Sequence, residues 1–159
     1  MTDPVTIRRN DRASLPHFAA LNAQWIEALH VMEPSDEAMV RAPEIYLENG
    51  GQVFTAHIGE VVVGAVALKP HPEGPSKGEW ELTKMAVDTR FRGHGIGQKL
   101  MDAVETYARD TLGLGRIFLL SNTANAAALR LYARNGWTVN HEGPHPIYAR
   151  CNIGMEKTL

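Results

Sequence analysis

The sequence predicts an α/β fold built on a mixed sheet, and three observations indicate it. Runs typical of strands, either alternating or continuously apolar, recur along the chain. Amphipathic helical segments separate several of them, giving the order β-α-α-β-β-β-α-β-α-β-β. The length of 159 residues suits one domain with a sizeable core. We therefore expect a single domain spanning residues 1–159.

Two helices are expected after a first strand at residues 5–9. The first has apolar residues spaced three or four apart, as on one face of a helix: Phe18, Leu21, Trp25 and Leu29. Ser35, followed by two acidic residues, marks the start of the second helix, and Pro43 limits how far it runs.

The middle of the chain predicts three strands. Residues 52–58 and 61–68 are strands joined by a short turn at Gly59-Glu60. Residues 69–78, with three prolines and two glycines, predict a loop, and residues 79–87 form the next strand.

The last third alternates helices and strands. Apolar spacing predicts a helix over 96–112, and a continuously apolar run predicts a buried strand at 116–121. A second helix is expected at 125–134, with final strands at 137–139 and 151–157.

Composition excludes several classes of protein. The net charge of −2 gives no electrostatic support for nucleic-acid binding. The single cysteine, Cys151, excludes an internal disulfide framework and favours a reducing compartment. The N-terminal residues lack the apolar core of a secretory signal, and no apolar run approaches the roughly 20 residues that span a bilayer. We expect a cytoplasmic protein that binds no membrane.

The stretch RFRGHGIGQKL at residues 90–100 places three glycines between a predicted strand and a predicted helix. Unsatisfied N–H groups and the helix dipole make such a position an anion site, and Arg92 adds a positive charge. A glycine-rich turn without a ligand is the alternative. The stretch is not a Walker A loop, because Gly97 is followed by Gln-Lys-Leu. It is not a Rossmann fingerprint, because the third glycine comes one residue early.

Residues 92–97 instead fit the pattern Arg/Gln-x-x-Gly-x-Gly/Ala. Before them runs the strand sequence ELTKMAVD at 81–88, and after them residues 125–137 match Asn-x-x-Ala-x-x-Leu-Tyr-x-x-x-Gly-aromatic. Over about residues 79–137 the chain thus resembles the GNAT superfamily of acyl-CoA-dependent N-acetyltransferases. The resemblance implies a single mixed, mostly antiparallel sheet flanked by helices and splayed at its central strands.

The resemblance also implies a cosubstrate, acetyl-CoA, whose pyrophosphate the glycine loop binds through backbone N–H groups, with no metal. The acetyl group would pass to a primary amine of a small molecule or peptide by direct attack in a ternary complex. Homodimers are common in the family. The acceptor amine and the length of the acyl group stay open. The implied coenzyme-binding residues are Met85, Ala86, Val87, Arg92, Gly93, His94, Gly95, Ile96, Gly97, Gln98 and Asn125.

Glu81 is the first candidate for a catalytic base. An alkyl amine has a pKa near 10.4, so only about one in 10³ is neutral at pH 7 and a base is useful. In family members with a strand glutamate base, that residue lies four positions before the residue whose amide meets the acyl carbonyl, as Glu81 does before Met85. On a regular strand both residues, with Glu79, share one face. Glu79 is the second candidate, and a merely salt-bridged strand carboxylate is the alternative.

Tyr132 is the second catalytic candidate and lies seven residues after Asn125, on the same helix face. The resemblance implies that Asn125 holds the pantetheine chain and that Tyr132 faces the sulfur; a packing tyrosine is the alternative. Transfer of a proton from a phenol with a pKa near 10 to the thiolate of a thiol with a pKa near 8.5 is unfavourable by roughly 2 kcal/mol. Either the site lowers the pKa of Tyr132, or its hydroxyl only donates a hydrogen bond.

Other polar residues carry weaker expectations. His94 occupies a variable motif position and is expected to face solvent, and Pro144 argues against a metal-binding helical pair of His141 and His145. In this fold the substrate side is usually covered by the segment that contains Trp25, Glu33, Asp36, Glu37 and Tyr46. A solvated helix face also explains the three acids among them. The loops at 69–78 and 141–150 are the other candidate substrate walls.

Two further classes of function compete with an acetyltransferase. One is a catalytically inactive acyl-CoA-binding or sensor module of the same fold, against which Glu81 and Tyr132 argue. The other is a different phosphate-binding enzyme, such as a nucleotide kinase, against which the missing Lys-Ser/Thr after Gly97 argues.

Overall fold

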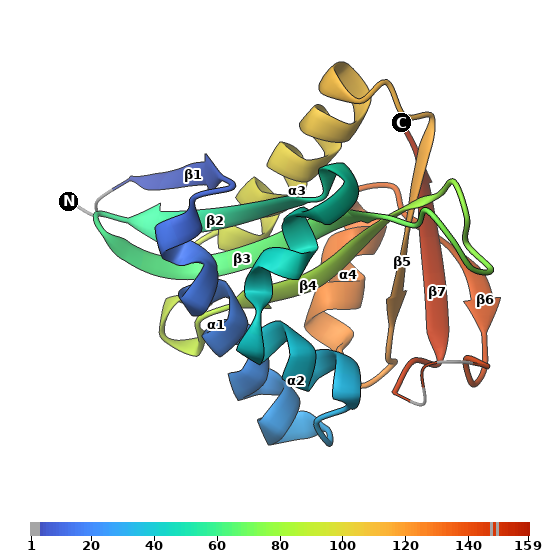
Figure 1. The fold of residues 1–159 in the computed structure, drawn as a ribbon, viewed down its shortest axis with the longest axis horizontal. Helices are drawn as coiled ribbons and strands as arrows, with labels where there is room; N and C mark the ends of the chain where they lie inside the picture. The colour runs from blue at the N-terminus through green and yellow to red at the C-terminus, as the bar shows by residue number, and fades with distance from the viewer. Residues whose placement is uncertain (1–3, 147, 149) are drawn as a thin grey trace.

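A computed structural model of the chain describes residues 4–146, 148 and 150–159, and these form one seven-stranded sheet with the order β1-β2-β3-β4-β5-β7-β6 (Figure 1). Neighbouring strands run antiparallel except β4 and β5, which are parallel. The predicted mixed, mostly antiparallel sheet is confirmed. The strands are β1 (Val5–Arg9), β2 (Gln52–Ile58), β3 (Val61–Pro70), β4 (Trp80–Val87), β5 (Arg116–Ser121), β6 (Thr138–Glu142) and β7 (Ile153–Thr158).

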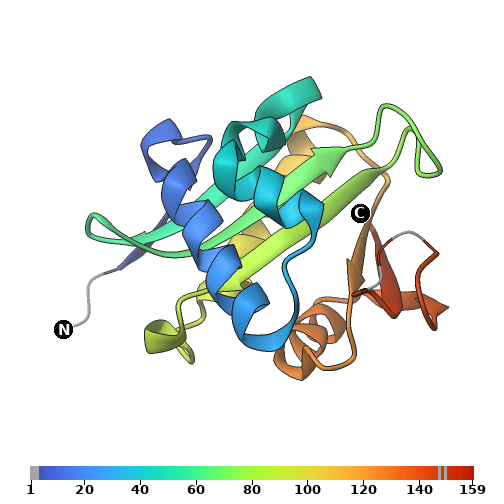
Figure 2. The ribbon, with the colours of Figure 1, turned by 60° about the horizontal axis from the view of Figure 1, so that its bottom comes forward.

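Four α-helices flank the sheet, and the predicted order of strands and helices is confirmed. They are α1 (Leu15–Leu29), α2 (Pro34–Arg41), α3 (Ile96–Thr106) and α4 (Ala126–Arg134). Short helical segments that the sequence did not predict are η1 (Arg12–Ser14), η2 (Pro43–Gly50) and η3 (Thr89–Phe91). The π-helical η4 (Tyr107–Thr111) continues α3 within the helix predicted over 96–112. Figures 1 and 2 show α1 and α2 on one face of the sheet and α3 on the other.

Each face of the sheet has its own hydrophobic core. On one face α1, α2 and η2 pack on β2 and β3, with Phe18 and Met39 fully buried. On the other face α3 and α4 pack on the sheet around Leu100, Ile117 and Tyr132. Each fully buried large apolar side chain contributes about 1.5–3 kcal/mol, so both helix layers are held by burial.

The buried face of α1 differs from the predicted one. Phe18 is fully buried as expected, but the face continues through Asn22 and Ile26, both at 0% exposure, and Trp25 is only half-buried. The Leu29 side chain lies outside the described residues. Asn22 belongs to the core because its amide donates to the carbonyls of Phe18 and Lys84. The prediction rested on apolar residues alone, so it left out Asn22 and placed the buried face of α1 wrongly.

A β-bulge interrupts β4 at its centre. Thr83 pairs with Ala67 and Ala86 pairs with Ala65, so two residues of β4 oppose a single residue of β3. One of the two is Lys84, whose φ of 58° lies in the left-handed region. Because the bulge shifts the alternation, Met85 packs against the α3 core while Thr83 lines a cleft on the opposite face. The predicted common face for Glu81 and Met85 was therefore wrong.

The parallel strands β4 and β5 separate soon after they meet. Within the described residues their ladder contains one pair, Glu81 with Phe118. Beyond this pair β4 continues along β3 and β5 continues along β7, as the views in Figures 1 and 2 both show. This is the predicted splay of the central strands.

Candidate active site

A cleft of about 130 Å³ opens where β4 and β5 separate. Its walls come from α1 and the start of α2, from η2, from the end of β3, from the two diverging strands, from the N-terminus of α4, and from the loop between β6 and β7. The lining residues are Trp25, Glu33, Ser35, Tyr46, Lys69, Glu81, Thr83, Lys84, Leu120, Ser121, Asn122, Asn125, Tyr148, Arg150 and Cys151.

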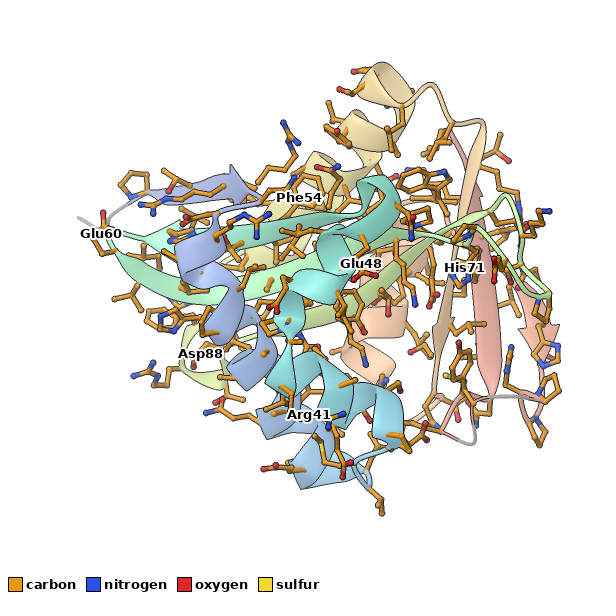
Figure 3. All side chains as sticks on the ribbon, viewed as in Figure 1. Arg41, Glu48, Phe54, Glu60, His71 and Asp88 are labelled. Carbon is orange, nitrogen blue, oxygen red and sulfur yellow. The ribbon has the colours of Figure 1, made fainter. Side chains whose placement is uncertain are left out.

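Glu81 lies in this cleft at the one point where β4 pairs with β5. The residue is only 9% exposed, and its Oε1 lies 2.8 Å from Nε2 of His71. His71 begins the loop between β3 and β4, and Figure 3 places it beside β5. The other candidate base, Glu79, lies outside the cleft lining, and its carboxylate pairs with Arg116. The structure thus separates the two candidates by position.

A buried ion cluster closes one side of the cleft. The carboxylate of Asp36 on α2 is fully buried. It accepts hydrogen bonds from Lys84 Nζ at 2.7 Å, from Arg150 Nη1 and Nη2 at 2.6 and 2.9 Å, and from the Glu33 backbone at 2.9 Å. The Glu33 carboxylate completes a capping box at the start of α2. The cluster therefore connects α2 to the bulge of β4 and to the loop before β7.

Two opposing effects act on the pKa of Asp36. Burial raises it, but the hydrogen bonds from Arg150 and Lys84 outweigh burial, and the pKa lies well below its usual range. Asp36 is therefore a permanent anion that holds two cations. Sequence reasoning placed Asp36 near the substrate, but as a solvated helix acid or an amine-binding acid, and the structure assigns it to this cluster instead.

Two tyrosines and one thiol near Glu81, those of Tyr46, Tyr148 and Cys151, stay protonated at neutral pH. Burial, followed by the negative charge of Glu81, raises the pKa of Tyr46 and of Tyr148. Burial likewise raises the pKa of the Cys151 thiol. Lys69 lies with its ammonium 5.9 Å from the Tyr46 ring centre. Glu81 is consequently the lining carboxylate that is not committed to a helix cap or to the buried cluster.

The glycine loop joins β4 to α3 and shows why its glycines are needed. Gly93 and Gly95 have φ values of 81° and 72°, which disfavour other residues, and open space surrounds both. Gly95 is the N-cap of α3, and no side chain of the described residues caps the first N–H groups of that helix. A Cβ at Gly97 would lie 3.0 Å from Leu131, so this glycine allows close packing of α3 on α4. The third glycine thus has a packing role that the sequence did not indicate.

The side chains of the loop differ in their availability. Arg92 is exposed, and it makes no ion pair within the described part of the chain. His94 is exposed as expected, with Nδ1 2.9 Å from the Phe91 carbonyl oxygen. Ile96 is buried. The Gln98 amide donates to Asp102 and exchanges hydrogen bonds with Asn135 at the end of α4, so it fastens the two helices together.

The two α4 residues that the sequence singled out occupy different surroundings. Asn125 is the N-cap of α4, lines the cleft, and donates to Ser121 Oγ at 3.2 Å. Tyr132 is 5% exposed, packs 5.9 Å from the Trp137 ring, and does not line the cleft. Burial raises the pKa of Tyr132 to about 12. A site that lowers this pKa, one of the two predicted alternatives, is therefore not supported.

The histidines near the C-terminus form no visible metal centre. The rings of His141 and His145 lie 6.2 Å apart, edge to face, and His145 Nδ1 accepts a hydrogen bond from the Tyr148 backbone. Across the ranges that the structure describes, no group of three or more metal-binding side chains converges.

Sequence reasoning did not single out several residues of the site, among them Lys84, Arg150 and His71. Lys84 did leave a signal, because a charged residue inside a mostly apolar strand needs a buried partner. Arg150 and His71 come from irregular loops, where spacing carries no information about direction.

A family model described as the acetyltransferase (GNAT) family matches residues 19–137. The chain belongs to this family. Rat N-acetyltransferase 8F1 is 33% identical over 93 residues, which is 58% of this chain and 42% of the rat protein. The chain thus spans about two fifths of the length of the curated relatives it matches first.

Solved structures confirm the fold. A GNAT-family acetyltransferase from Staphylococcus aureus has a TM-score of 0.82 at 22% identity, covering 98% of this chain and 99% of that one. A putative acetyltransferase from Salmonella typhimurium, solved with its cofactor acetyl-CoA, has a TM-score of 0.78 at 20% identity, covering 99% and 95%. Among the described residues, no helix combines the length and apolar character needed to cross a bilayer.

Replacing Asp36 should test the ion cluster. Asp36→Asn leaves Lys84 and Arg150 without their anion, and we expect a loss of about 3–5 kcal/mol in the free energy of unfolding at pH 7. Because the folded pKa lies below the unfolded value near 4, the Asp36 contribution is fully present above that value and is lost as pH falls below it.

Urea unfolding from pH 3 to 7 measures this dependence. The exposed neighbour Glu37 on the same helix provides the control, since Glu37→Gln should change stability by less than about 0.5 kcal/mol. Equal stability of Asp36→Asn and Glu37→Gln would show that the cluster does not support the fold.

Proposed function

We propose that the protein is an acetyl-CoA-dependent N-acetyltransferase that acts on a primary amine of a small molecule or peptide by direct attack in a ternary complex. The observation that carries this proposal is the carboxylate of Glu81 in the cleft between the splayed strands, which belongs neither to a helix cap nor to the buried cluster. Membership of the acetyltransferase family supports the same reaction class.

The glycine loop is the proposed site for the coenzyme. Within the part of the chain that the structure describes, no side chain caps the N–H groups at the start of α3. Gly93 and Gly95 leave open space above these groups, as an approaching pyrophosphate requires. The exposed guanidinium of Arg92 adds a charge for phosphate oxygens. Backbone groups of 85–87 would hold the pantetheine arm beside the splay, and Asn125 would hold it from α4. The backbone of 93–98, rather than the Gln98 or Ile96 side chain, makes the remaining contacts.

Each proposed catalytic group has one task. Bound acetyl-CoA supplies the thioester whose acyl carbon the amine attacks. Glu81 accepts a proton from the acceptor ammonium, because the protonated amine has no lone pair for attack. The N–H of Met85 donates to the acyl oxygen as negative charge develops there. The hydroxyl of Tyr132 donates a hydrogen bond toward the sulfur as it becomes a thiolate. Protonation by Tyr132 would be uphill by about 5 kcal/mol, since its pKa is about 12 and a thiol has a pKa near 8.5.

The charges of the cleft restrict the acceptor. Its lining holds the cations Lys69, Lys84 and Arg150 and the acids Glu33 and Glu81, with the Asp36 carboxylate behind them. The acids therefore do not outnumber the cations, and a polycationic amine would meet no compensating excess of negative charge. Aromatic walls from Trp25 and Tyr46 suit an acceptor with an apolar or ring-shaped part.

A thiol-release assay with acetyl-CoA tests the function. Monoamines and amino acids should turn over at least tenfold faster, by kcat/KM, than spermidine at equal ionic strength. Binding of acetyl-CoA without turnover of any amine would instead identify an inactive coenzyme-binding module. Faster turnover of spermidine would contradict the charge argument.

Glu81→Gln should lower kcat about 10²–10⁴-fold at pH 7, the usual contribution of a general base. The deficit should shrink as pH approaches the pKa of the amine, because the amine then loses its proton unaided. Glu79→Gln, on the same strand but outside the cleft, is the matched control and should retain activity. A loss for Glu81→Gln that is equal from pH 7 to 10 would place the base elsewhere.

Tyr132→Phe should lower kcat roughly 10–150-fold and leave the acetyl-CoA KM within twofold, since the sulfur carries charge only as its bond breaks. With a pKa of about 12, the wild-type hydroxyl stays protonated through pH 10, so this group should produce no alkaline loss of activity below that pH. Steady-state rates of the folded variant, with Tyr107→Phe as control, decide the matter. Losses beyond about 10³-fold would indicate full proton transfer instead.

A further inference from the structure

His71 contacts the proposed base, Glu81, although no sequence motif indicated such a role for His71. Its Nε2 lies 2.8 Å from Glu81 Oε1, and the side chains of His71 and Glu81 are only 15% and 12% exposed. No other hydrogen bond joins the Glu81 carboxylate to the part of the chain that the structure describes. One oxygen of the carboxylate is thus fixed, and Oε2 is left for a ligand in the cleft.

His71 itself is fixed from three sides. Its backbone N–H donates to the Glu79 carbonyl at 2.9 Å, and its carbonyl accepts from Gly78 N–H at 2.8 Å. Its ring lies 5.5 Å from the ring of Phe118, the β5 residue that pairs with Glu81. Figure 3 shows His71 at this junction of the β3–β4 loop with β5. An imidazole held in this way fixes the rotamer of the glutamate that it contacts.

Other titratable and charged groups surround the pair of His71 and Glu81. Within the described residues, those that line the cleft with Glu81 are Lys69, opposite it on β3, Tyr46 on η2, and Tyr148 and Cys151 before β7, together with Glu33, Lys84 and Arg150. Burial raises the pKa values of both tyrosines and of the cysteine thiol. Histidine side chains as a class change charge between about pH 5 and 8.

We propose that His71 is a positioning residue that acts through Glu81, and this proposal rests on the proposed function. Its Nε2–H donates to Oε1 and aims Oε2 at the acceptor. In the step itself an ammonium N–H bond breaks and an O–H bond forms at Oε2; His71 keeps its proton, and Glu81 later releases its own to water. A protonated His71 stabilises the carboxylate and weakens it as a base, so deprotonation of His71 makes Glu81 a stronger base.

Two variants and a double variant test this role. His71→Ala should lower kcat roughly 10–100-fold without changing the acetyl-CoA KM, whereas His71→Gln, which keeps an N–H donor, should recover at least a third of the activity at pH 8. In the Glu81→Gln background, His71→Ala should cause less than a twofold further loss, because the residue that it positions is already absent. The exposed His17 supplies the control His17→Gln.

The pH dependence provides a readout that a purely structural role would not move. The acid limb of kcat/KM should lie at higher pH in His71→Gln than in wild type, because glutamine cannot supply the positive charge that keeps Glu81 ionised. An NMR titration of the His71 ring requires no turnover: Glu81→Gln should lower its midpoint, because the negative neighbour is removed.

The outcomes separate the two proposals. A wild type without amine-dependent turnover overturns the proposed function and this role with it. An active wild type overturns the role of His71 alone if His71→Ala retains wild-type kcat, or if it slows both backgrounds by the same factor. An unchanged NMR midpoint in Glu81→Gln would also overturn it. Thermal melting and acetyl-CoA KM confirm that each variant is folded.

Discussion

The shape of the cleft depends on the ion pairs that the fully buried carboxylate of Asp36 makes with Lys84 and Arg150. A lone anion in this position would be strongly disfavoured, because its hydration is lost. Lys84 approaches it from the bulge of β4 and Arg150 from the loop before β7. The three charges are satisfied because α2, the bulge and that loop lie together. Electrostatics thus fixes the cleft wall where the diverging strands provide no backbone ladder.

Because of the bulge, residues of β4 before and after it face opposite sides of the sheet. Before the bulge, Glu81 and Thr83 face the cleft beneath α1 and α2, whereas Met85 after it packs toward α3. The glycine loop that follows leads directly into α3. The proposed base and the proposed coenzyme loop therefore lie near opposite ends of one short strand, and reactants from the two faces would meet in the gap between β4 and β5.

Much of the architecture could be predicted from local patterns. The strands at 52–58 and 116–121 have the predicted bounds, because continuous apolar runs between turn residues define them well. The splay followed from the resemblance of the motifs, and the glycine-rich entry to α3 followed from the position of the glycines between a predicted strand and a predicted helix. A helical projection puts Asn125 and Tyr132 on one face of α4. Only the structure shows that Asn125 lines the cleft while Tyr132 lies in the hydrophobic core against which α4 packs.

The errors have physical causes that lie outside local pattern. The bulge at Lys84 adopts a left-handed φ without a glycine, and the ion pair with Asp36, 48 positions earlier, accompanies it. The buried face of α1 contains Asn22, whose polarity is compensated by long-range hydrogen bonds. Gly97 was interpreted through a ligand, yet its absent Cβ makes room for Leu131. In each case a partner distant in sequence decides the role of the residue.

The hydrogen bonds that close the β3–β4 loop at His71 have a consequence for engineering. They join His71 to Gly78 and Glu79, so residues 72–77 project beyond a closed neck, and most of them are exposed. Doubling the length of a flexible loop costs only about 0.6 kcal/mol in closure entropy. This tip is therefore a natural graft point, where a recognition peptide or a dye-bearing insert can be exchanged while the neck and the strands below it keep their geometry.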